Sequence, residues 1–167
     1  MQKRQDVKFA IVGGGTALEG DEELANQMGL SEYIDFYGRV SDEMLVDVLN
    51  TCNVCVNPDK PTEMNNLSTM NKIMEYMALK KPIVQYDLKE GRASALEASL
   101  YATNHDTADF AKKIMWLLDN PEEGQRMAEY GYDRVLNKLS WDYERENLIG
   151  FYRTALQIKH APLVQPI

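Results

Sequence analysis

The sequence predicts an α/β fold built on a parallel β-sheet, because short apolar runs alternate along it with stretches of helical periodicity. Glycine or proline closes several apolar runs, as at Gly13-Gly14-Gly15 and at Asn57-Pro58, which is typical of strands that end in tight turns. The last third of the chain shows helical stretches with no strand between them. We therefore expect those C-terminal helices to pack outside the sheet or to reach another structure.

The individual elements follow from local signals taken in chain order. The apolar runs predict strands at residues 8–12, 33–37, 54–56, 82–86 and, more briefly, 100–102. Helical spacing predicts helices at residues 18–30, from 41 onward, at 68–79, 107–119, 121–138 and 140–159. Ser41 is a good N-cap residue, and Gly29 lies where a helix would end. A polar loop is expected at 59–66.

Composition excludes several classes of function. The formal net charge is −8 over 167 residues, which argues against nucleic acid and against direct contact with an anionic membrane. No apolar run approaches the ~20 residues that span a bilayer, and no signal-peptide pattern follows Met1. The expected location is therefore the cytoplasm.

Cysteine and histidine supply no ligand set for a metal. Cys52-Asn-Val-Cys55 is the only cysteine pair, and core packing is the favoured interpretation because free cysteine is usually buried. Neither His105 nor His160 has a partner at ligand spacing. We expect no metal and no cofactor, and the sequence identifies no catalytic residue.

Ligands of open parallel sheets bind beyond the carboxyl ends of the strands, near helix N-termini. Three segments fit that position, at residues 13–16, 38–41 and 65–71. The triple glycine lets a ligand approach the backbone, although it lacks the Gly-x-Gly-x-x-Gly spacing of a dinucleotide site. One ligand touching all three segments is the expectation.

The predicted helix 68–79 carries polar residues on one stripe and apolar residues on the other, because a helix advances about 100° per residue. The polar stripe contains Ser68, Asn71, Lys72 and Glu75, and the apolar one contains Met70, Ile73, Met74, Met77 and Ala78. One interpretation is an ordinary solvated face with a Lys72–Glu75 pair. The other is a nucleotide site, with phosphate at the helix N-terminus beside Lys72 and ribose hydroxyls on the Glu75 carboxylate one turn deeper.

Longer stretches favour the second interpretation. The order "AIVGGG", "MGLSEYIDFYGRVSDEML", "NVCVNPDK" and "STMNKIMEYMALKKPIVQYDLKEGR" resembles the C-terminal, donor-nucleotide-binding half of family 4, or group 1, glycosyltransferases. The resemblance covers about residues 6–156 and implies a Rossmann-like parallel sheet with helices on both faces. That is one half of a GT-B fold. It further implies transfer of a sugar from a nucleotide donor with retention of configuration, in bacterial surface polysaccharide synthesis.

The resemblance also implies roles for individual residues. The backbone of Gly38, Arg39 and Val40 would contact the base. Ser68, Thr69, Met70 and Asn71 would hold the diphosphate, and Glu75 would match the second Glu of the Glu-x7-Glu motif and bind the ribose. On physical grounds Lys72 adds a positive charge beside the phosphates, and the glycine turn with Gly14 and Gly15 lets the ligand approach the backbone. The first Glu of that motif falls at Leu67, and Asn65, Asn66 or Ser68 would have to substitute for it. A UDP-sugar is the expected donor, with a GDP-sugar second.

The resemblance further leads us to expect that the given sequence is one piece of such an enzyme. By the family's pattern it would open on the second strand of the domain, without the first strand and helix and without the N-terminal acceptor domain. The expected domain therefore spans 6–156, followed by a loose tail at 157–167. Its expected partners are a nucleotide-sugar donor and the missing acceptor domain. Membrane contact, peripheral and at the inner membrane, would occur only through that missing half.

Two alternatives stay open on the sequence. A nucleotide-sugar epimerase shares the two-domain shape, but the run from Lys72 through Glu75-Tyr76-Met77-Ala78 is closer to the transferases. A non-catalytic α/β interaction domain, such as a receiver, would need an acidic cluster where Gly13-Gly14-Gly15 stands. A panel of nucleoside diphosphates that stabilises the fold would favour the nucleotide site over the interaction domain.

The isolated chain is expected to bind a nucleotide without transferring sugar, because transfer requires donor and acceptor to be held together. A radiolabelled nucleotide-sugar assay with the purified chain checks this expectation. Acceptor-dependent release of nucleoside diphosphate would contradict it.

Overall fold

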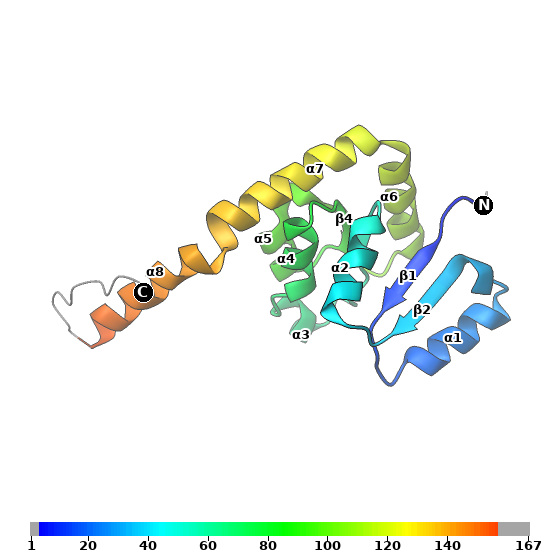
Figure 1. Ribbon diagram of the computed structural model, residues 1–167, viewed down its shortest axis with the longest axis horizontal. Helices are drawn as coiled ribbons and strands as arrows, with labels where there is room; N and C mark the ends of the chain where they lie inside the picture. The colour runs from blue at the N-terminus through cyan, green and yellow to red at the C-terminus, as the bar shows by residue number, and fades with distance from the viewer. Residues whose placement is uncertain (1–3, 157–167) are drawn as a thin grey trace. The chain divides into compact units, whose positions relative to one another are not determined.

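The computed structural model describes residues 4–156 of the chain (Figure 1). These fold into two compact units, residues 4–52 and 53–156, and each is described by itself. The predicted tail at 157–167 lies outside the described residues. The predicted bounds of a single domain at 6–156 stay a prediction.

The first unit is a two-stranded parallel sheet with its connecting helices. It contains β1 (Phe9–Val12), α1 (Leu18–Gln27), the 3₁₀ turn η1 (Ser31–Tyr33), β2 (Ile34–Gly38) and α2 (Asp42–Thr51). The strands pair from Phe9 with Ile34, and the register shifts between Ile11 and Val12. The predicted N-cap is present, since the Ser41 hydroxyl accepts a hydrogen bond from the Met44 N–H and so begins α2.

The second unit contains a three-stranded parallel sheet in the order β3-β4-β5. Its strands are β3 (Cys55–Asn57), β4 (Ile83–Tyr86) and β5 (Ser99–Ala102). All four residues of the central strand β4 are buried, as expected for a strand covered on both faces, and one of them, Gln85, is polar. Its helices are α3 (Glu63–Asn66), α4 (Asn71–Ala78), α5 (Lys89–Ala95), α6 (Thr107–Asp119), α7 (Pro121–Arg134) and α8 (Trp141–Ala155).

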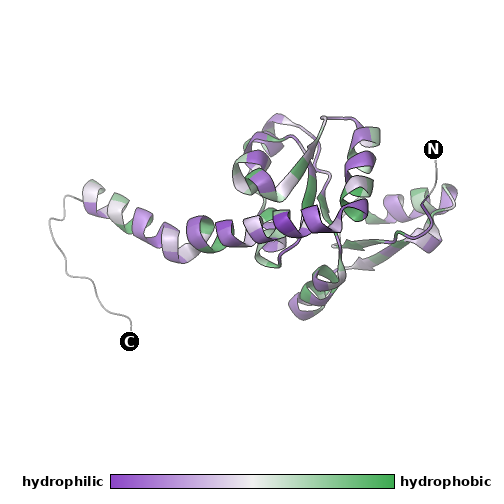
Figure 2. Cartoon of the chain, turned by 90° about the horizontal axis from the view of Figure 1, so that it is seen from above, coloured by the Kyte–Doolittle hydropathy of each residue, from purple (hydrophilic) through white to green (hydrophobic). Residues whose placement is uncertain are grey.

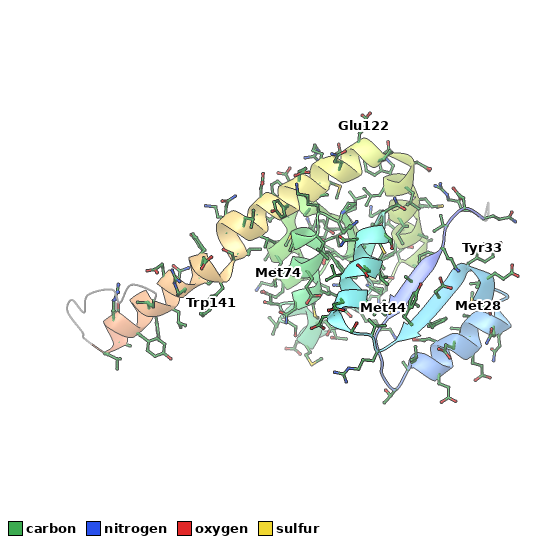
Figure 3. The ribbon with its side chains drawn as sticks, viewed as in Figure 1. Met28, Tyr33, Met44, Met74, Glu122 and Trp141 are labelled. Carbon is green, nitrogen blue, oxygen red and sulfur yellow. The ribbon has the colours of Figure 1, made fainter. Side chains whose placement is uncertain are left out.

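Helices cover both faces of this sheet. On one face Val84, Tyr86 and Ala102 pack against Phe110 and Leu117 of α6. On the other face Ile83 packs with Ile73 and Met77 of α4, and Met74, labelled in Figure 3, is partly buried beside them. Apolar colour follows the strands of this unit in Figure 2. The predicted class, a Rossmann-like parallel sheet with helices on both faces, is confirmed.

Helix α7 approaches α4 closely because residue 131 is glycine. A Cβ built at Gly131 would lie 2.9 Å from the Ala98 Cβ and 2.9 Å from the Met77 Cγ, which is shorter than real carbon contacts. Met77 is fully buried. The glycine therefore fixes how the buried stripe of α4 faces the sheet, and with it how the opposite stripe faces outward.

Several local predictions were wrong in instructive ways. Helix α4 begins at Asn71, so Ser68, Thr69 and Met70 belong to the segment that leads into it. The polar stretch 59–66 contains the short helix α3, which the Thr62 hydroxyl caps by accepting from the Asn65 N–H. Helix α5 was not predicted at all. Ala78, expected on the buried stripe, is exposed.

The last two helices were predicted at 121–138 and 140–159, and the structure confirms a break at Ser140. Helix α7 ends at Arg134 and continues as a π-helical segment, η3 (Val135–Leu139), before α8. None of the residues of α8 is buried, and Trp141 and Phe151 are about two-thirds exposed. Trp141 is labelled in Figure 3. Within residues 4–156, none of the helices combines the length and the apolar character needed to cross a membrane.

Substitution of Gly131 by alanine is expected to destabilise the fold by about 1–2 kcal/mol, because overpacking against Ala98 and Met77 exceeds the gain in helix propensity. Equilibrium urea denaturation measures the change in free energy of unfolding. Gly150 in α8 is the matched control, since a Cβ there meets nothing within 4 Å. Gly150→Ala is expected to stabilise by about 0.5–1 kcal/mol. Equal effects of the two substitutions would contradict the packing argument.

Candidate functional site

The N-terminus of α4 has no side-chain cap, which leaves its first backbone N–H groups available to a ligand. Met70 is its N-cap residue, in extended conformation, and no side chain caps the helix there. The first N–H groups of any helix lack intrahelical partners and carry the positive end of the dipole. Asn71 and Lys72 are the first two residues of the helix, and Asn71 is exposed.

The Lys72 ammonium pairs with Asp59 and not with Glu75. Its Nζ lies 3.0 Å from the Asp59 Oδ2, and both side chains are partly exposed. The Lys72–Glu75 pair, which belonged to the first of the two interpretations, is therefore not formed, and Asp59 is a partner that the sequence did not indicate. Asp59 lies in the turn after β3 and Lys72 lies in α4, 13 positions further along the chain, so no helical spacing relates the two residues.

The Glu75 carboxylate is exposed one turn into α4. Across residues 4–156, no hydrogen bond or ion pair engages this carboxylate, and only its backbone carbonyl is used, by the Leu79 N–H. Its orientation follows from the burial of Ile73 and Met77 on the opposite side of the helix. The stripe of Lys72 and Glu75 thus faces away from the core, as predicted.

The segment leading into α4 is fastened to α5 by two hydrogen bonds. The Oδ1 of Asn66, the last residue of α3, accepts from the Lys89 N–H at 3.1 Å and so satisfies the first backbone N–H of α5. The Thr69 hydroxyl donates to the Glu90 Oε2 at 3.2 Å. A second carboxylate, Glu90, is therefore brought to the N-terminal side of α4.

Other predicted residues of this segment are used by the protein itself. The Ser68 hydroxyl donates to the Met64 carbonyl at the end of α3. Asn65 donates through its side chain to the Lys60 carbonyl. Leu67, at the position of the first motif Glu, is 65% exposed. Of the three suggested substitutes for that Glu, Asn65, Asn66 and Ser68, each already has a hydrogen-bond partner.

The other predicted residues lie together in the first unit. The Gly13 N–H donates to the Gly38 carbonyl at 2.8 Å, joining the ends of β1 and β2. Gly13 and Gly38 have positive φ, at 138° and 63°, conformations that favour glycine. A Cβ at Gly14 would lie 3.9 Å from the Arg39 Cβ, so this turn packs beside Arg39. Gly15 and Arg39 are exposed, and Val40 is half-buried.

The structure thus brings the predicted residues together in two groups, one in each unit. Gly14, Gly15, Gly38, Arg39 and Val40 form the first group, at the carboxyl ends of β1 and β2. Ser68 to Glu75 form the second, at the start of α4. Binding of one ligand to both groups stays a prediction.

Polar contacts beyond β4 hold α5 in place. The Arg92 Nε lies 2.6 Å from the Asp87 Oδ1, and the Arg92 guanidinium stacks 3.8 Å from the centre of the Tyr101 ring. The hydrogen bond from Arg92 lowers the pKa of the Asp87 carboxyl below its ordinary value. Burial raises the pKa of the Tyr101 phenol, which donates to the Leu96 carbonyl. Gly91 lies directly over the buried Gln85, whose side chain donates to the Gly91 carbonyl.

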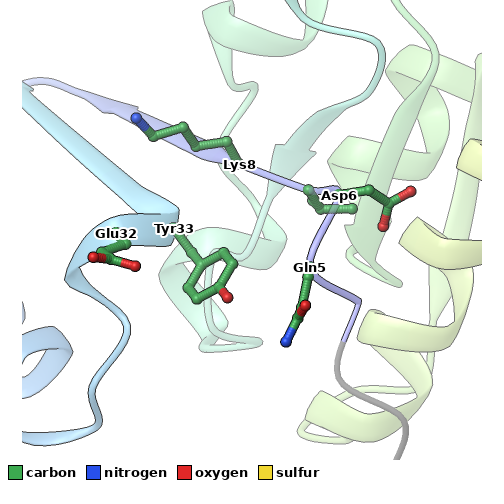
Figure 4. Close-up of a pocket in the computed structure, with 6 residues that line it drawn as sticks. Gln5, Asp6, Lys8, Glu32 and Tyr33 are labelled. Carbon is green, nitrogen blue, oxygen red and sulfur yellow. The ribbon is translucent and has the colours of Figure 1, made fainter.

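A hollow in the first unit lies away from all of these residues. It has a volume of about 350 Å³, opens to solvent and lies beside the start of β1 (Figure 4). Its lining residues are Gln5, Asp6, Val7, Lys8, Glu32 and Tyr33. None of the predicted site residues contributes to it, and ligands of parallel sheets bind at the opposite, carboxyl ends of the strands.

Comparison with known proteins identifies the family. The model of the group 1 glycosyl transferases matches residues 1–120. The chain belongs to this family, and its fold is that of a GT-B half-domain.

Two curated relatives and two solved structures extend the comparison. The chain is 26% identical over 155 residues to the alpha-D-kanosaminyltransferase of Streptomyces kanamyceticus, covering 91% of this chain and 39% of that protein. It is 26% identical over 159 residues to the D-inositol 3-phosphate glycosyltransferase of Thermomonospora curvata, covering 91% and 36%. The chain therefore spans well under half the length of these relatives.

Among solved structures, sucrose-phosphate synthase from Thermosynechococcus elongatus has a TM-score of 0.79 at 21% identity, over 90% of this chain and 39% of that one. An Anabaena protein solved in complex with UDP has a TM-score of 0.71 at 15% identity, over 90% and 42%. At these identities the structures establish the fold alone.

The Asp87–Arg92 pair is expected to contribute to stability in a pH-dependent way. Because the folded-state pKa of Asp87 is lowered, the contribution is present above its unfolded pKa and is lost as the pH falls through the lowered value. Both side chains are about half exposed, so Asp87→Asn is expected to cost less than about 1 kcal/mol near neutral pH and nearly nothing in acid. Urea denaturation near neutral pH and in acid measures the change in the free energy of unfolding at each pH.

Asp142→Asn is the control for this comparison, because Asp142 is 90% exposed and lies 3.8 Å from Arg145. It is expected to leave the free energy of unfolding unchanged at both pH values. A cost of Asp87→Asn that persists undiminished in acid would show that the ion pair is not its source.

Proposed function

We propose that this chain is the donor-binding domain of a retaining glycosyltransferase, which moves a sugar from a nucleoside-diphosphate sugar to a glycan or lipid-linked acceptor. The donor is a UDP-sugar, with a GDP-sugar as the second choice. The full enzyme acts in the cytoplasm, in bacterial surface polysaccharide synthesis, together with an acceptor-binding domain.

The observation that carries the proposal is the pairing of an uncapped helix start with a free carboxylate one turn deeper. The first turn of α4 offers backbone N–H groups and the Lys72 ammonium to phosphate oxygens. The exposed Glu75 carboxylate has no partner among the described side chains, and its two oxygens suit the neighbouring hydroxyls of a ribose. Phosphate and ribose at that spacing belong to a nucleotide.

Family membership supports the same assignment. Both curated relatives are named as transferases of sugar groups, and one structural neighbour was solved with UDP. The match to a glycosyl transferase model over most of the chain favours transfer over epimerisation. Retention of configuration and the polysaccharide product rest on the resemblance of the motifs alone.

Glu75→Ala is expected to weaken UDP binding by about 1.5–3 kcal/mol, because the substitution removes charge-assisted hydrogen bonds to the ribose. The melting temperature is expected to stay close to that of the unsubstituted chain, since the Glu75 side chain is exposed. Isothermal titration calorimetry and thermal melts measure the two quantities.

The matched control is Glu122→Ala, which removes an exposed glutamate at the start of α7 (Figure 3). UDP binding is expected to be unchanged in this variant. If Glu75→Ala preserves affinity while stability falls, Glu75 has a structural role and the proposed site is wrong. Absence of binding by the unsubstituted chain to every nucleoside diphosphate would reject the function as a whole.

A further inference from the structure

Lys72 occupies an electrostatically unfavourable position. It is the second residue of α4, where the helix dipole places partial positive charge. A lysine there is repelled by the helix start and has four flexible side-chain bonds through which to move its ammonium into water. The cation that the proposed site needs beside a phosphate therefore requires a partner to stay there.

Asp59 provides that partner. Its Oδ2 lies 3.0 Å from the Lys72 Nζ, and the exposed fractions of the two side chains are 27% for Asp59 and 39% for Lys72. The pair is thus partly shielded from water, which strengthens it relative to a fully exposed pair.

The turn that carries Asp59 is itself fixed. Asp59 follows β3 by two residues, and the next residue, Lys60, is tied through its carbonyl to the Asn65 side chain at 2.8 Å. The Thr62 N–H also donates to the Lys60 carbonyl at 2.8 Å. The carboxylate is therefore presented to α4 from a short, internally hydrogen-bonded turn.

We propose that Asp59 is a positioning residue for nucleotide binding, which holds the Lys72 ammonium beside the N-terminus of α4. This inference rests on the proposed function. An ammonium has three N–H donors, so the bond to Asp59 leaves two for phosphate oxygens. Asp59 does not touch the ligand, and its effect on binding passes through Lys72.

The Asp59 charge also repels a phosphate, and the two effects oppose each other. The attraction to Lys72 acts at contact distance, whereas the repulsion acts across the intervening ammonium and through partly exposed surroundings. Since Coulomb energy falls with distance and with solvent screening, the positioning effect dominates. Removal of the Asp59 charge weakens phosphate binding.

A double-mutant cycle on the full chain tests the proposal, with UDP and its phosphate-free counterpart uridine as probes. Asp59→Asn is expected to raise the Kd for UDP about three- to tenfold and to leave that for uridine unchanged. In the Lys72→Gln background, Asp59→Asn is expected to cause no further loss of affinity, because only the repulsion between Asp59 and the phosphate is then removed. Asp59→Glu, which keeps the charge, is expected to restore binding to within about threefold of the unsubstituted chain.

Glu129→Gln is the matched control, because it breaks a comparable ion pair, 2.9 Å long, between Glu129 and Lys80. It is expected to leave UDP binding unchanged. Tighter or unchanged UDP binding by the Asp59→Asn variant overturns the proposal. So does a loss of UDP affinity that is equally large when Lys72 is already replaced by glutamine, or an equal loss of affinity for uridine. In those cases UDP binding by the unsubstituted chain still upholds the proposed function, whereas its absence overturns both.

Discussion

The contact between α7 and α4 through Gly131 is the constraint on which the candidate site depends. Because no side chain separates the helices there, Met77 and Ala98 fill the space, and Met77 is held against the sheet with Ile73. A helix whose buried side is fixed in this way has no freedom to rotate. Lys72 and Glu75 consequently face outward because of residues on the far side of α4, none of which is a candidate for ligand contact.

Most of the fold follows from local patterns in the sequence, and the departures have physical causes. The strand run 82–86 and the helix 107–119 were predicted almost to the residue, since proline, asparagine and apolar spacing mark their ends clearly. Helix α5 was not predicted, because Lys89-Glu90-Gly91-Arg92 has the composition of a turn. Glycine is used there since a Cβ at Gly91 would lie against the buried Gln85 side chain, a contact that local sequence cannot indicate.

The site shows the same division between local and long-range information. The outward stripe of α4 could be predicted from spacing, whereas the helix was expected to begin at Ser68 and begins at Asn71. The Asp59–Lys72 pair and the Thr69–Glu90 hydrogen bond could not be predicted, because each joins segments whose proximity depends on how the helices pack on the sheet. Loop carboxylates have no periodicity, and only the three-dimensional arrangement distinguishes a solvated acid from one that orients a lysine.

The two hydrogen bonds from the segment before α4 to the start of α5 have a consequence for protein engineering. Asn66 and Thr69 make that segment and the seven-residue α5 one modular unit, although more than twenty positions separate them in the chain. A chimaera that took only this segment from another enzyme would leave the Lys89 N–H and the Glu90 carboxylate without these hydrogen-bond partners. Exchange of substrate preference between homologues therefore calls for transplanting both pieces at once.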